Sequence, residues 1–559
     1  MNKPSSHPAN FIFILSDTHR YDAMSFTNPL KEHFEIYTPN MERMAQEGVS
    51  FKNCYTNLPI CSPARAIYQT GRWPFQWGGI ANHMDLNDRV DEEGNENKTL
   101  GFLFKNAGYS TFHVGKWHQG LENNAQNAGY DESYIWSNER HDSMIYCHNG
   151  GDFQDLDSND ILGDGSGIPY TGVSKCDTFS FPAFPNHPYK IIGQTDQALA
   201  LLDRHDIDAS PFFLTLCMQD PHGPFTGTDS APEWGDFSHR SDYPELYRHD
   251  ENHPAKALKP YQSYIDNPVY MPYDRIHNAV NNYDYYGSIT AVDEQLGRVL
   301  DWLDNQPESV RDNTIVIYTS DHGAMGGAQN VAGGQKRWPH DPSSRIPFLV
   351  RWHKGIENPG READELLSFI DFFPTFCHLA GLDKILAEKS DKASLESLGY
   401  LRASPGVSHS RNIIAESGGP DPDSVFLFHF SNMNSISSPC PIHRTVVTKD
   451  WVYGVKGKTR LGGKPDWTEW DEPGGWLYDR NKDPFQLDNL FFNENFEAIR
   501  TELHPLLEGW MKEAELPFRK RWFEKTPRKN IEAWSSECGI LSEDEEAMRV
   551  QGQSYVMNV

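Results

Sequence analysis

The stretch from Asn10 to Asp22, NFIFILSDTHRYD, opens with an apolar run and closes with charged residues. A short continuous apolar run that is rich in isoleucine and phenylalanine is typical of a strand buried on both faces of a sheet. Asp17 follows this run almost at once. The stretch therefore predicts a buried strand over residues 10–15 with a carboxylate at its C-terminal end.

The same kind of run recurs along the chain. Four further examples are STFHVG (110–115), PFFLTLC (211–217), TIVIYT (314–319) and IPFLVRW (346–352). Segment 282–305 has apolar residues at helical spacing, and other helical stretches lie between the runs. Because strands alternate with helices, we predict an α/β fold whose large, mixed, mostly parallel sheet is sandwiched by helices.

Ionisable side chains follow four of these predicted strands. They are Asp17, Lys116, His118, His222, Asp321 and His322. In an open α/β sheet, ligands bind beyond the carboxyl ends of the strands. One such residue alone would more often be a surface charge or a hydrogen-bonded core histidine. Since four strands carry them to the same edge, we expect the six side chains to surround one site.

A second motif spans Ile60–Pro74, ICSPARAIYQTGRWP. Pro63 suits the first turn of a helix and Gly71 suits its end, so Cys61 should lie at the helix N-terminus. Unpaired N–H groups and the helix dipole favour negative charge there. Arg65, four residues on, should face the same way. The motif is compatible with a thiolate nucleophile and equally with an anion subsite.

The pattern changes after about residue 405. Segment 443–457 alternates like a hairpin strand, segment 474–490 predicts a strand and a turn, and a helix is expected near 495–514. We therefore predict two domains. They are a catalytic domain over residues 1–404 and a C-terminal α+β subdomain over residues 405–559, with a small antiparallel sheet and a helix.

One long stretch, 225–280, is rich in Tyr, Pro, Asp and His and shows little periodicity. It predicts long loops, which in a domain of this size are often functional. Together with Trp73 and Trp77, the aromatic side chains of this stretch offer surfaces on which sugars could stack.

Charge and hydropathy along the chain bear on its partners and its compartment. The formal net charge of −29 repels nucleic acid and anionic membranes, so neither is expected as a partner. No apolar run reaches the length of a membrane span. The first ten residues lack the apolar core of a signal peptide. As the chain stands we expect a cytoplasmic protein, or a periplasmic or secreted one if a presequence was removed.

The eight cysteines of the chain show no CxxC pair, so buried free thiols are expected.

The Cys61 motif resembles a known family. CSPAR (61–65), followed by TGR (70–72), is similar to the Cys-x-Pro-x-Arg…Thr-Gly-Arg signature of the type I sulfatases, which belong to the alkaline phosphatase-like superfamily. Further matches come in family order: ILSDTHRYD (14–22), GYSTFHVGKWHQG (108–120), DPHGPF (220–225), YYGSITAVDEQLGRVL (285–300), SDHG (320–323), and Lys336 with RIPF (345–348). The resemblance covers most of residues 10–380. It implies an alkaline phosphatase-like fold.

The resemblance also implies a nucleophile. In that family a dedicated maturation enzyme oxidises the cysteine to Cα-formylglycine, so this enzyme is an expected partner and Cys61 the expected precursor. One hydroxyl of the hydrated aldehyde attacks the sulfur of a sulfate ester, and the second hydroxyl later releases sulfate. Arg65 would orient and stabilise this group.

Acid, base and charge-stabilising roles follow from the same resemblance. His222 or Lys336 would protonate the leaving alcohol, and His118 is the candidate base for the release of sulfate. Sulfate oxygens gain charge in transit, so the site needs fixed positive charge. Lys116 and Lys336 would provide it together with a divalent cation.

The implied ligands of that cation are Asp17, Thr18, Cys61 after oxidation, Asp321 and His322. Oxygen-rich ligation favours calcium, and the histidine leaves magnesium or manganese open. Thr18 stands where many sulfatases have a second aspartate, and His322 stands where others have asparagine. The Asp-His pair also occurs in phosphonate monoester hydrolases and phosphodiesterases that use formylglycine, and these enzymes are the first alternative.

The leading hypothesis is thus a sulfatase that acts on a sulfated monosaccharide or short oligosaccharide. An acidic surface is a poor fit to a long polyanion unless the pocket is locally basic. A catalytically inactive carbohydrate-binding member of the family is a third hypothesis. The sequence carries no signal for the oligomeric state.

Overall fold

The computed structural model of the chain describes a defined set of residues. These are residues 8–29, 31, 36–74, 99–119, 125–136, 145–148, 154–155, 180–181, 184–188, 190–222, 275–326, 328, 336–382, 405–429, 443–456 and 475–515.

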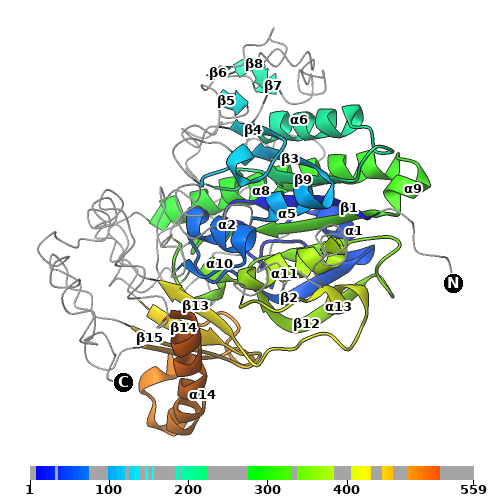
Figure 1. The fold of residues 1–559 in the computed structure, drawn as a ribbon. Helices are drawn as coiled ribbons and strands as arrows, with labels where there is room; N and C mark the ends of the chain where they lie inside the picture. Colours follow the sequence, from blue (N-terminus) through cyan, green and yellow to red (C-terminus); the bar gives the residue numbers. More distant parts are fainter. Residues whose placement is uncertain are drawn as a thin grey trace, which may run out of the picture.

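A ten-stranded sheet forms the centre of the molecule (Figure 1). Its strands lie in the order β12 (Arg361–Ser368), β2 (Val49–Tyr55), β11 (Phe348–Arg351), β10 (Thr314–Ser320), β1 (Asn10–Ser16), β9 (Phe212–Cys217), β3 (Ser110–Gly115), β4 (Glu132–Trp136), β5 (Ile145–His148) and β6 (Gln154–Asp155). The five strands from β10 to β4 are parallel. β11 is antiparallel to both of its neighbours. The prediction of a mixed, mostly parallel sheet is confirmed.

Helices cover both faces of this sheet because its strands alternate their side chains. In β1, Phe11, Phe13 and Leu15 belong to one buried cluster, whereas Ile12 and Ile14 belong to another. The first cluster includes residues of α2 (Cys61–Thr70), α5 (Leu100–Ala107) and α11 (Phe369–Leu379). The second includes residues of α1 (Pro39–Gln46), α6 (Lys190–Arg204) and α8 (Arg275–Asp304). Burial on both sides explains why the sequence shows continuous apolar runs in this sheet.

A separate antiparallel sheet follows in the C-terminal region (Figure 1). It contains β13 (Val425–His429), β14 (His443–Val447), β15 (Trp451–Lys456) and β16 (Gly475–Asp479) in that order. α14 (Glu497–Trp510) contacts β14 and β15 and continues into a π-helical turn, Met511–Glu515. The predicted strand 443–457 is a hairpin of two strands. The boundary between residues 404 and 405 stays a prediction.

The remaining elements are short. They are the strands β7 (Ser180–Phe181) and β8 (Phe184–Pro188), the helices α9 (Glu308–Arg311), α10 (Asp341–Ser344) and α13 (Ser410–Ile414), and the 3₁₀ turns Ala125–Ala128, Leu490–Phe492 and Glu494–Phe496.

The parallel strands end together at one edge of the sheet. Beyond their ends the backbone continues to pair: the Asp321 N–H donates to the Ser16 carbonyl at 3.1 Å, and the Lys116 N–H donates to the Cys217 carbonyl at 2.8 Å. Gly115 makes the second pairing possible, since its φ is +102° and a Cβ there would lie 2.1 Å from the Cys217 carbonyl oxygen. This edge carries the candidate site.

Trp73 corrects one expectation. It is 1% exposed, and its ring packs edge-on against Phe426, Phe428 and Trp510. A ring enclosed in this way cannot stack on a sugar, so the prediction for Trp73 is wrong. Trp77 and residues 225–274 lie outside the described residues. Residues 275–280, which were expected in loops, belong to α8.

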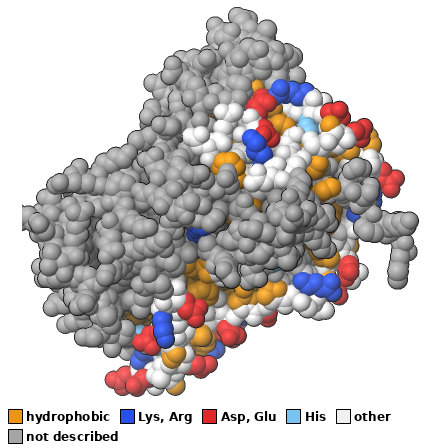
Figure 2. Space-filling model, viewed as in Figure 1, with side chains coloured by type: hydrophobic (Ala, Val, Ile, Leu, Met, Phe, Trp, Pro, Cys, Tyr) orange, Lys and Arg blue, Asp and Glu red, His pale blue; other side chains and the backbone are white. Residues whose placement is uncertain are grey.

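Surface charge and the cysteines are two further features of the described residues that bear on the sequence expectations. On the face shown in Figure 2, described Asp and Glu side chains lie among Lys and Arg side chains at several places. Cys54, Cys61, Cys217 and Cys377 are buried free thiols. Within the described ranges, no helix is long and apolar enough to cross a bilayer.

Candidate active site

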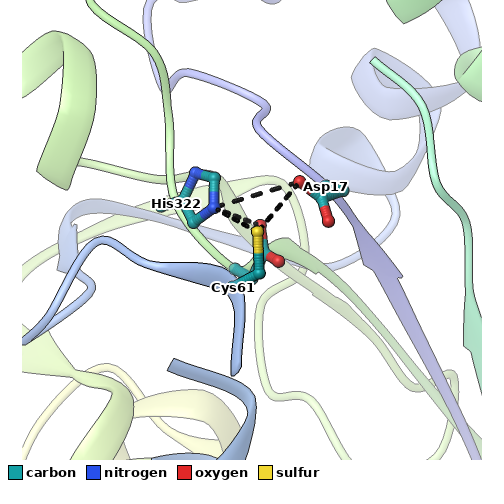
Figure 3. Close-up of side chains that lie close together, drawn as sticks. Asp17, Cys61 and His322 are labelled. Carbon is teal, nitrogen blue, oxygen red and sulfur yellow. Dashed lines mark hydrogen bonds and ion pairs between the residues drawn. The ribbon is translucent and has the colours of Figure 1, made fainter. Parts of the chain in front are cut away.

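Cys61 lies where the sequence motif predicts, at the first residue of α2, and the helix ends before Gly71 with φ +60°. Its side chain is 1% exposed. Lys336 Nζ lies 2.8 Å from Cys61 Sγ, and His322 Nε2 lies 3.3 Å from it. The side chain is therefore enclosed among cationic and imidazole nitrogens, as Figure 3 shows for His322.

Asp17, Cys61, Asp321 and His322 form one compact group of possible metal ligands. Each offers a donor atom, and all four atoms lie within 4.8 Å of one another. The His322 Nδ1 lies 2.8 Å from the Gly323 carbonyl oxygen, which can only accept. Nδ1 therefore carries the proton, and the Nε2 lone pair faces the group. Two buried carboxylates and an imidazole held in this tautomer fit a divalent cation.

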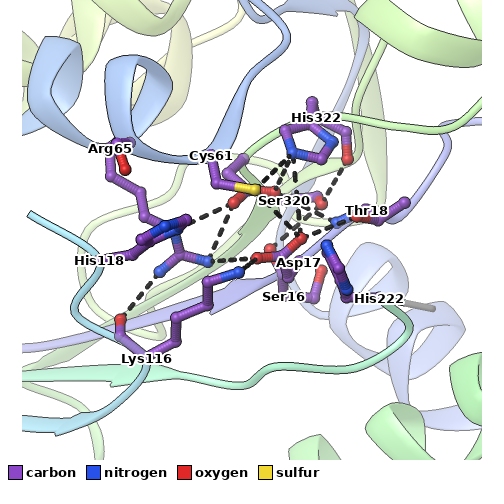
Figure 4. A network of polar contacts seen from close by, with 12 residues as sticks. Ser16, Asp17, Thr18, Cys61, Arg65, Lys116, His118, His222, Ser320 and His322 are labelled. Atoms are coloured by element: carbon purple, nitrogen blue, oxygen red, sulfur yellow. Dashed lines mark hydrogen bonds and ion pairs between the residues drawn. The ribbon is translucent and has the colours of Figure 1, made fainter. Parts of the chain in front are cut away.

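Arg65 bridges the carboxylates of Asp17 and Asp321. It is 1% exposed, and its guanidinium donates to Asp321 Oδ2 at 3.0 Å, to Asp17 Oδ2 at 3.2 Å and to the Lys116 carbonyl at 2.9 Å. These three bonds occupy the guanidinium and set the spacing of the carboxylates (Figure 4). The structure thus places Arg65 beside the two aspartates.

We expect Arg65→Met to destabilise the metal-free protein by about 3–5 kcal/mol, because two buried carboxylates lose their shared counter-ion. Urea unfolding followed by circular dichroism measures the loss. Arg311→Met is the control. Its ion pair with Asp312 is 36% exposed on the arginine side, and pairs of this kind contribute about 0–1 kcal/mol. Equal losses in the two variants would contradict the role assigned to Arg65.

Lys116 and His118 reach the site from the end of β3. Lys116 Nζ lies 2.6 Å from Asp17 Oδ2. His118 adopts φ +52° and hydrogen-bonds Cys61. Burial, together with Lys116, lowers the pKa of His118 to about 4. The ring is therefore neutral near pH 7 and able to accept a proton.

His222 reaches Cys61 from the segment after β9. It hydrogen-bonds Cys61, and its Nε2 lies 3.4 Å from Lys336 Nζ. Burial lowers the pKa of His222 below its usual value, despite the nearby Asp17 carboxylate. Lys336 comes from the segment before β11, so four separate parts of the chain meet at Cys61.

Thr18 links the two aspartates. Its Oγ1 donates to Asp17 Oδ1 at 2.7 Å and its N–H donates to Asp321 Oδ1 at 3.1 Å. The backbone of Thr18 has φ +75°, an unusual value for a β-branched residue. The Tyr285 hydroxyl donates to the Thr18 carbonyl at 2.8 Å and holds this turn. Tyr285 was not predicted as a residue of the site, although it lies within the family motif over residues 285–300.

The site contains both positively and negatively charged side chains, and these shift one another's pKa values. Burial and the Cys61 sulfur would raise the pKa of Asp17, but Lys116, His222 and Arg65 hold it well below its usual value. Burial and the Asp17 carboxylate raise the pKa of Asp321. The site contains three cationic side chains, Arg65, Lys116 and Lys336, and two carboxylates, Asp17 and Asp321. Cationic side chains thus outnumber carboxylates in the site, although the whole chain is acidic, and this excess favours an anionic group there.

The thiol itself is affected by the same cations. Burial would raise the pKa of Cys61, but Lys116 and Lys336 lower it well below its usual value. Lys116 keeps its charge, since Asp17 and Cys61 raise the pKa of Lys116 against the effect of burial. The environment of Cys61 therefore favours negative charge.

All ten predicted site residues lie in this one cluster. They are Asp17, Thr18, Cys61, Arg65, Lys116, His118, His222, Asp321, His322 and Lys336. Figure 4 labels all of them except Asp321 and Lys336. The fold is of the alkaline phosphatase-like type, and its parallel strands bring cations and possible metal-ligating carboxylates to one edge.

Comparison with known proteins identifies the family of the chain. A family model described as Sulfatase matches residues 9–382, more than half of the chain. The chain belongs to the sulfatase family, and its enzymatic class is that of a sulfuric ester hydrolase.

Individual relatives are distant but cover most of the chain. An ulvan-active sulfatase of Formosa agariphila is 25% identical over 520 residues, which is 92% of this chain and 83% of that protein. A solved structure described as bound to its substrate D-glucosamine-2-N,6-O-disulfate has a TM-score of 0.64 at 22% identity, covering 90% of this chain and 98% of that one. A phosphonate monoester hydrolase of Agrobacterium radiobacter has a TM-score of 0.60 at 19% identity, covering 90% of this chain and 96% of that one.

Proposed function

We propose that this sulfatase removes sulfate from a short sulfated saccharide, using formylglycine formed from Cys61 and one divalent cation. The observation that carries the proposal is the convergence on Cys61. Lys336, His118, His222 and His322 all contact its side chain. A buried side chain surrounded by proton donors and acceptors is suited to a covalent hydrolytic cycle. The maturation enzyme that oxidises Cys61 is the expected partner.

The oxidised side chain would supply one hydroxyl to attack sulfur and a second to release sulfate. Lys116 and Lys336 bring positive charge to the sulfate oxygens from two sides of Cys61. His222 or Lys336 protonates the leaving alcohol, since their nitrogens lie together beside Cys61. His118, neutral near pH 7, accepts the proton during sulfate release.

The cation would be held by Asp17, Asp321, His322 and the oxidised Cys61 side chain, and would supply charge stabilisation to the sulfate. Thr18 was expected as a further ligand. Its hydroxyl donates to Asp17, which leaves the oxygen lone pairs available, so Thr18 stays a proposed ligand that also orients that carboxylate. Two carboxylates favour calcium, and the imidazole is compatible with magnesium or manganese.

The saccharide part of the proposal rests on the names of relatives and on charge. One relative is described as ulvan-active, and one solved neighbour is described as bound to a disulfated glucosamine. The chain carries a formal net charge of −29, so a long polyanion would be repelled outside the cationic site. A monosaccharide or short oligosaccharide is therefore the proposed substrate.

A screen of sulfated mono- and oligosaccharides by sulfate release tests the proposal, with aryl sulfate, phosphate diester and phosphonate ester run in parallel. We expect sulfate esters to be hydrolysed best. The Asp321–His322 pair and the fold shared with a phosphonate monoester hydrolase support a second candidate. A preference for the phosphorus esters by orders of magnitude would establish that candidate and overturn the first.

Mass spectrometry of the Cys61 peptide separates both enzymes from an inactive family member. Protein from the native source should carry the aldehyde at this position. An unmodified thiol together with saccharide binding and no turnover would identify a binding protein instead.

A further inference from the structure

The segment that carries Lys336 turns sharply directly after it. Arg337 has φ +85°, in the left-handed region that residues other than glycine rarely adopt. Lys336 Nζ lies 2.8 Å from Cys61 Sγ and 3.4 Å from His222 Nε2. A backbone conformation of this kind persists only where surrounding contacts hold it.

His443, a residue of the C-terminal sheet, supplies one such contact. Its Nε2 lies 3.0 Å from the Arg337 carbonyl oxygen. His443 begins β14 and is 0% exposed. A carbonyl oxygen can only accept, so Nε2 carries the proton and donates. The contact therefore connects the second sheet directly to the backbone turn beside Lys336.

The orientation of the His443 ring is itself held within β14. Thr445 Oγ1 lies 3.1 Å from His443 Nδ1. With the proton on Nε2, the neutral ring accepts from the threonine hydroxyl at Nδ1. Gly454 pairs with Thr445 on the neighbouring strand, and a Cβ there would lie 2.3 Å from Thr445 Oγ1. The glycine thus leaves the space that the threonine hydroxyl needs.

The rest of the segment is anchored to the same sheet. Trp338 packs against the buried cluster of that sheet. His340 Nε2 lies 3.1 Å from the Tyr478 hydroxyl. Gln486 Oε1 accepts from the Asp341 N–H at 2.9 Å, and its Nε2 donates to Asp341 Oδ1 at 3.1 Å. These three contacts lie farther along the segment, and the contact closest to Lys336 is that of His443.

We infer that His443 is a positioning residue for Lys336: its hydrogen bond to the Arg337 carbonyl holds the turn that aims the Lys336 ammonium at Cys61. The inference rests on the proposed role of Lys336 in catalysis. The C-terminal sheet thereby contributes to the reaction through the position of Lys336.

Three variants of the matured enzyme test this. In His443→Leu the donor is lost, and kcat should fall about 10- to 100-fold, since small misplacements of a catalytic group have effects of this size. KM should stay within about twofold. His443→Gln retains an N–H near the position of Nε2 and should restore most of kcat. His504→Leu is the control, because it breaks a hydrogen bond between α14 and Tyr453 that has no link to Lys336.

A double-mutant cycle separates positioning from general damage to the fold. If His443 acts through Lys336, then His443→Leu should lower kcat no further in a Lys336→Ala background. Losses that multiply in the double variant would overturn the inference, and so would a failure of His443→Gln to restore kcat. If the parent enzyme hydrolysed phosphonate esters and no sulfate ester, the proposed function would fail, and the cycle would be measured on that ester.

A readout without turnover keeps the two failures distinct. Protein produced without the maturation enzyme retains the Cys61 thiol. Acetylation of the Lys336 amine by acetic anhydride, followed by mass spectrometry, reports how well that amine is held beside Cys61. The rate should rise in His443→Leu and stay at the parent rate in His443→Gln and His504→Leu. An unchanged rate in His443→Leu would overturn the inference even for an inactive chain.

Discussion

Cys61→Ala should lower kcat for sulfate ester hydrolysis by about 10⁴-fold or more, because removal of a nucleophile leaves only binding and charge stabilisation. Lys116 and Lys336 would still bring positive charge to the site, so substrate binding should survive. Alanine suits the start of α2, and the folded structure should be preserved. Sulfate release gives kcat, and circular dichroism verifies the fold.

Cys61→Ser and Cys54→Ala sharpen this experiment. Serine keeps an oxygen nucleophile but offers no second hydroxyl, so it should release one equivalent of alcohol and then stop. Cys54 is equally buried, on β2, and its thiol lies outside the described ligand group. Cys54→Ala should therefore lose some stability and keep its turnover. Turnover at the parent rate in Cys61→Ala would remove formylglycine from the mechanism.

His322→Ala should lower the metal content of the purified protein and reduce kcat/KM about 10²- to 10³-fold, the scale expected when a charge-stabilising cation is lost. The reason is geometric. His322 Nε2 lies 3.6 Å from Asp321 Oδ1 and 3.9 Å from Asp17 Oδ1, so its lone pair completes the ligand group. Elemental analysis gives the stoichiometry, and treatment of the parent with a chelator should reproduce the loss.

Two matched variants control for the metal experiment. His322→Asn offers an oxygen donor at the same position and should retain more metal than His322→Ala. His113→Ala removes another fully buried histidine, on β3, whose Nδ1 hydrogen-bonds Thr215 away from the ligand group. It should reduce stability and leave the metal stoichiometry intact. Metal content unchanged in His322→Ala would contradict the ligand assignment.

Much of the central fold was predictable from the sequence. The runs at 10–15, 110–115, 211–217 and 314–319 became β1, β3, β9 and β10 with shifts of about one residue at most. Burial on both faces makes these strands uniformly apolar, which is a strong local signal. β12, READELLS, was missed because its first half is polar and partly exposed at the sheet edge. The antiparallel direction of β11 was also unpredicted, since a buried run carries no mark of direction.

The sequence predicted which residues form the site better than it predicted which of them bond to one another. The sequence places a carboxylate, a lysine or a histidine after four of the five parallel strands, and the ends of parallel strands share an edge. It carries no information on which of these groups pair. The ion pairs of Arg65 with Asp17 and Asp321 were not predicted, and its expected role toward the oxidised Cys61 stays a prediction. The hydrogen bond from Thr18 to Asp17 was not predicted, and the expectation that Thr18 is a metal ligand stays a prediction.

The sequence by itself determined what depends on near neighbours. Apolar runs ended by ionisable residues determined the strands and the edge, and Pro63 and Gly71 determined the helix that begins at Cys61. Only the tertiary structure decided the strand order, the partners of Arg65, the burial of Trp73 and the contact of His443 with Arg337. These depend on how distant segments share one desolvated space, where each buried charge takes the partner that packing leaves within reach. Such competition among residues far apart in the chain has no local signature.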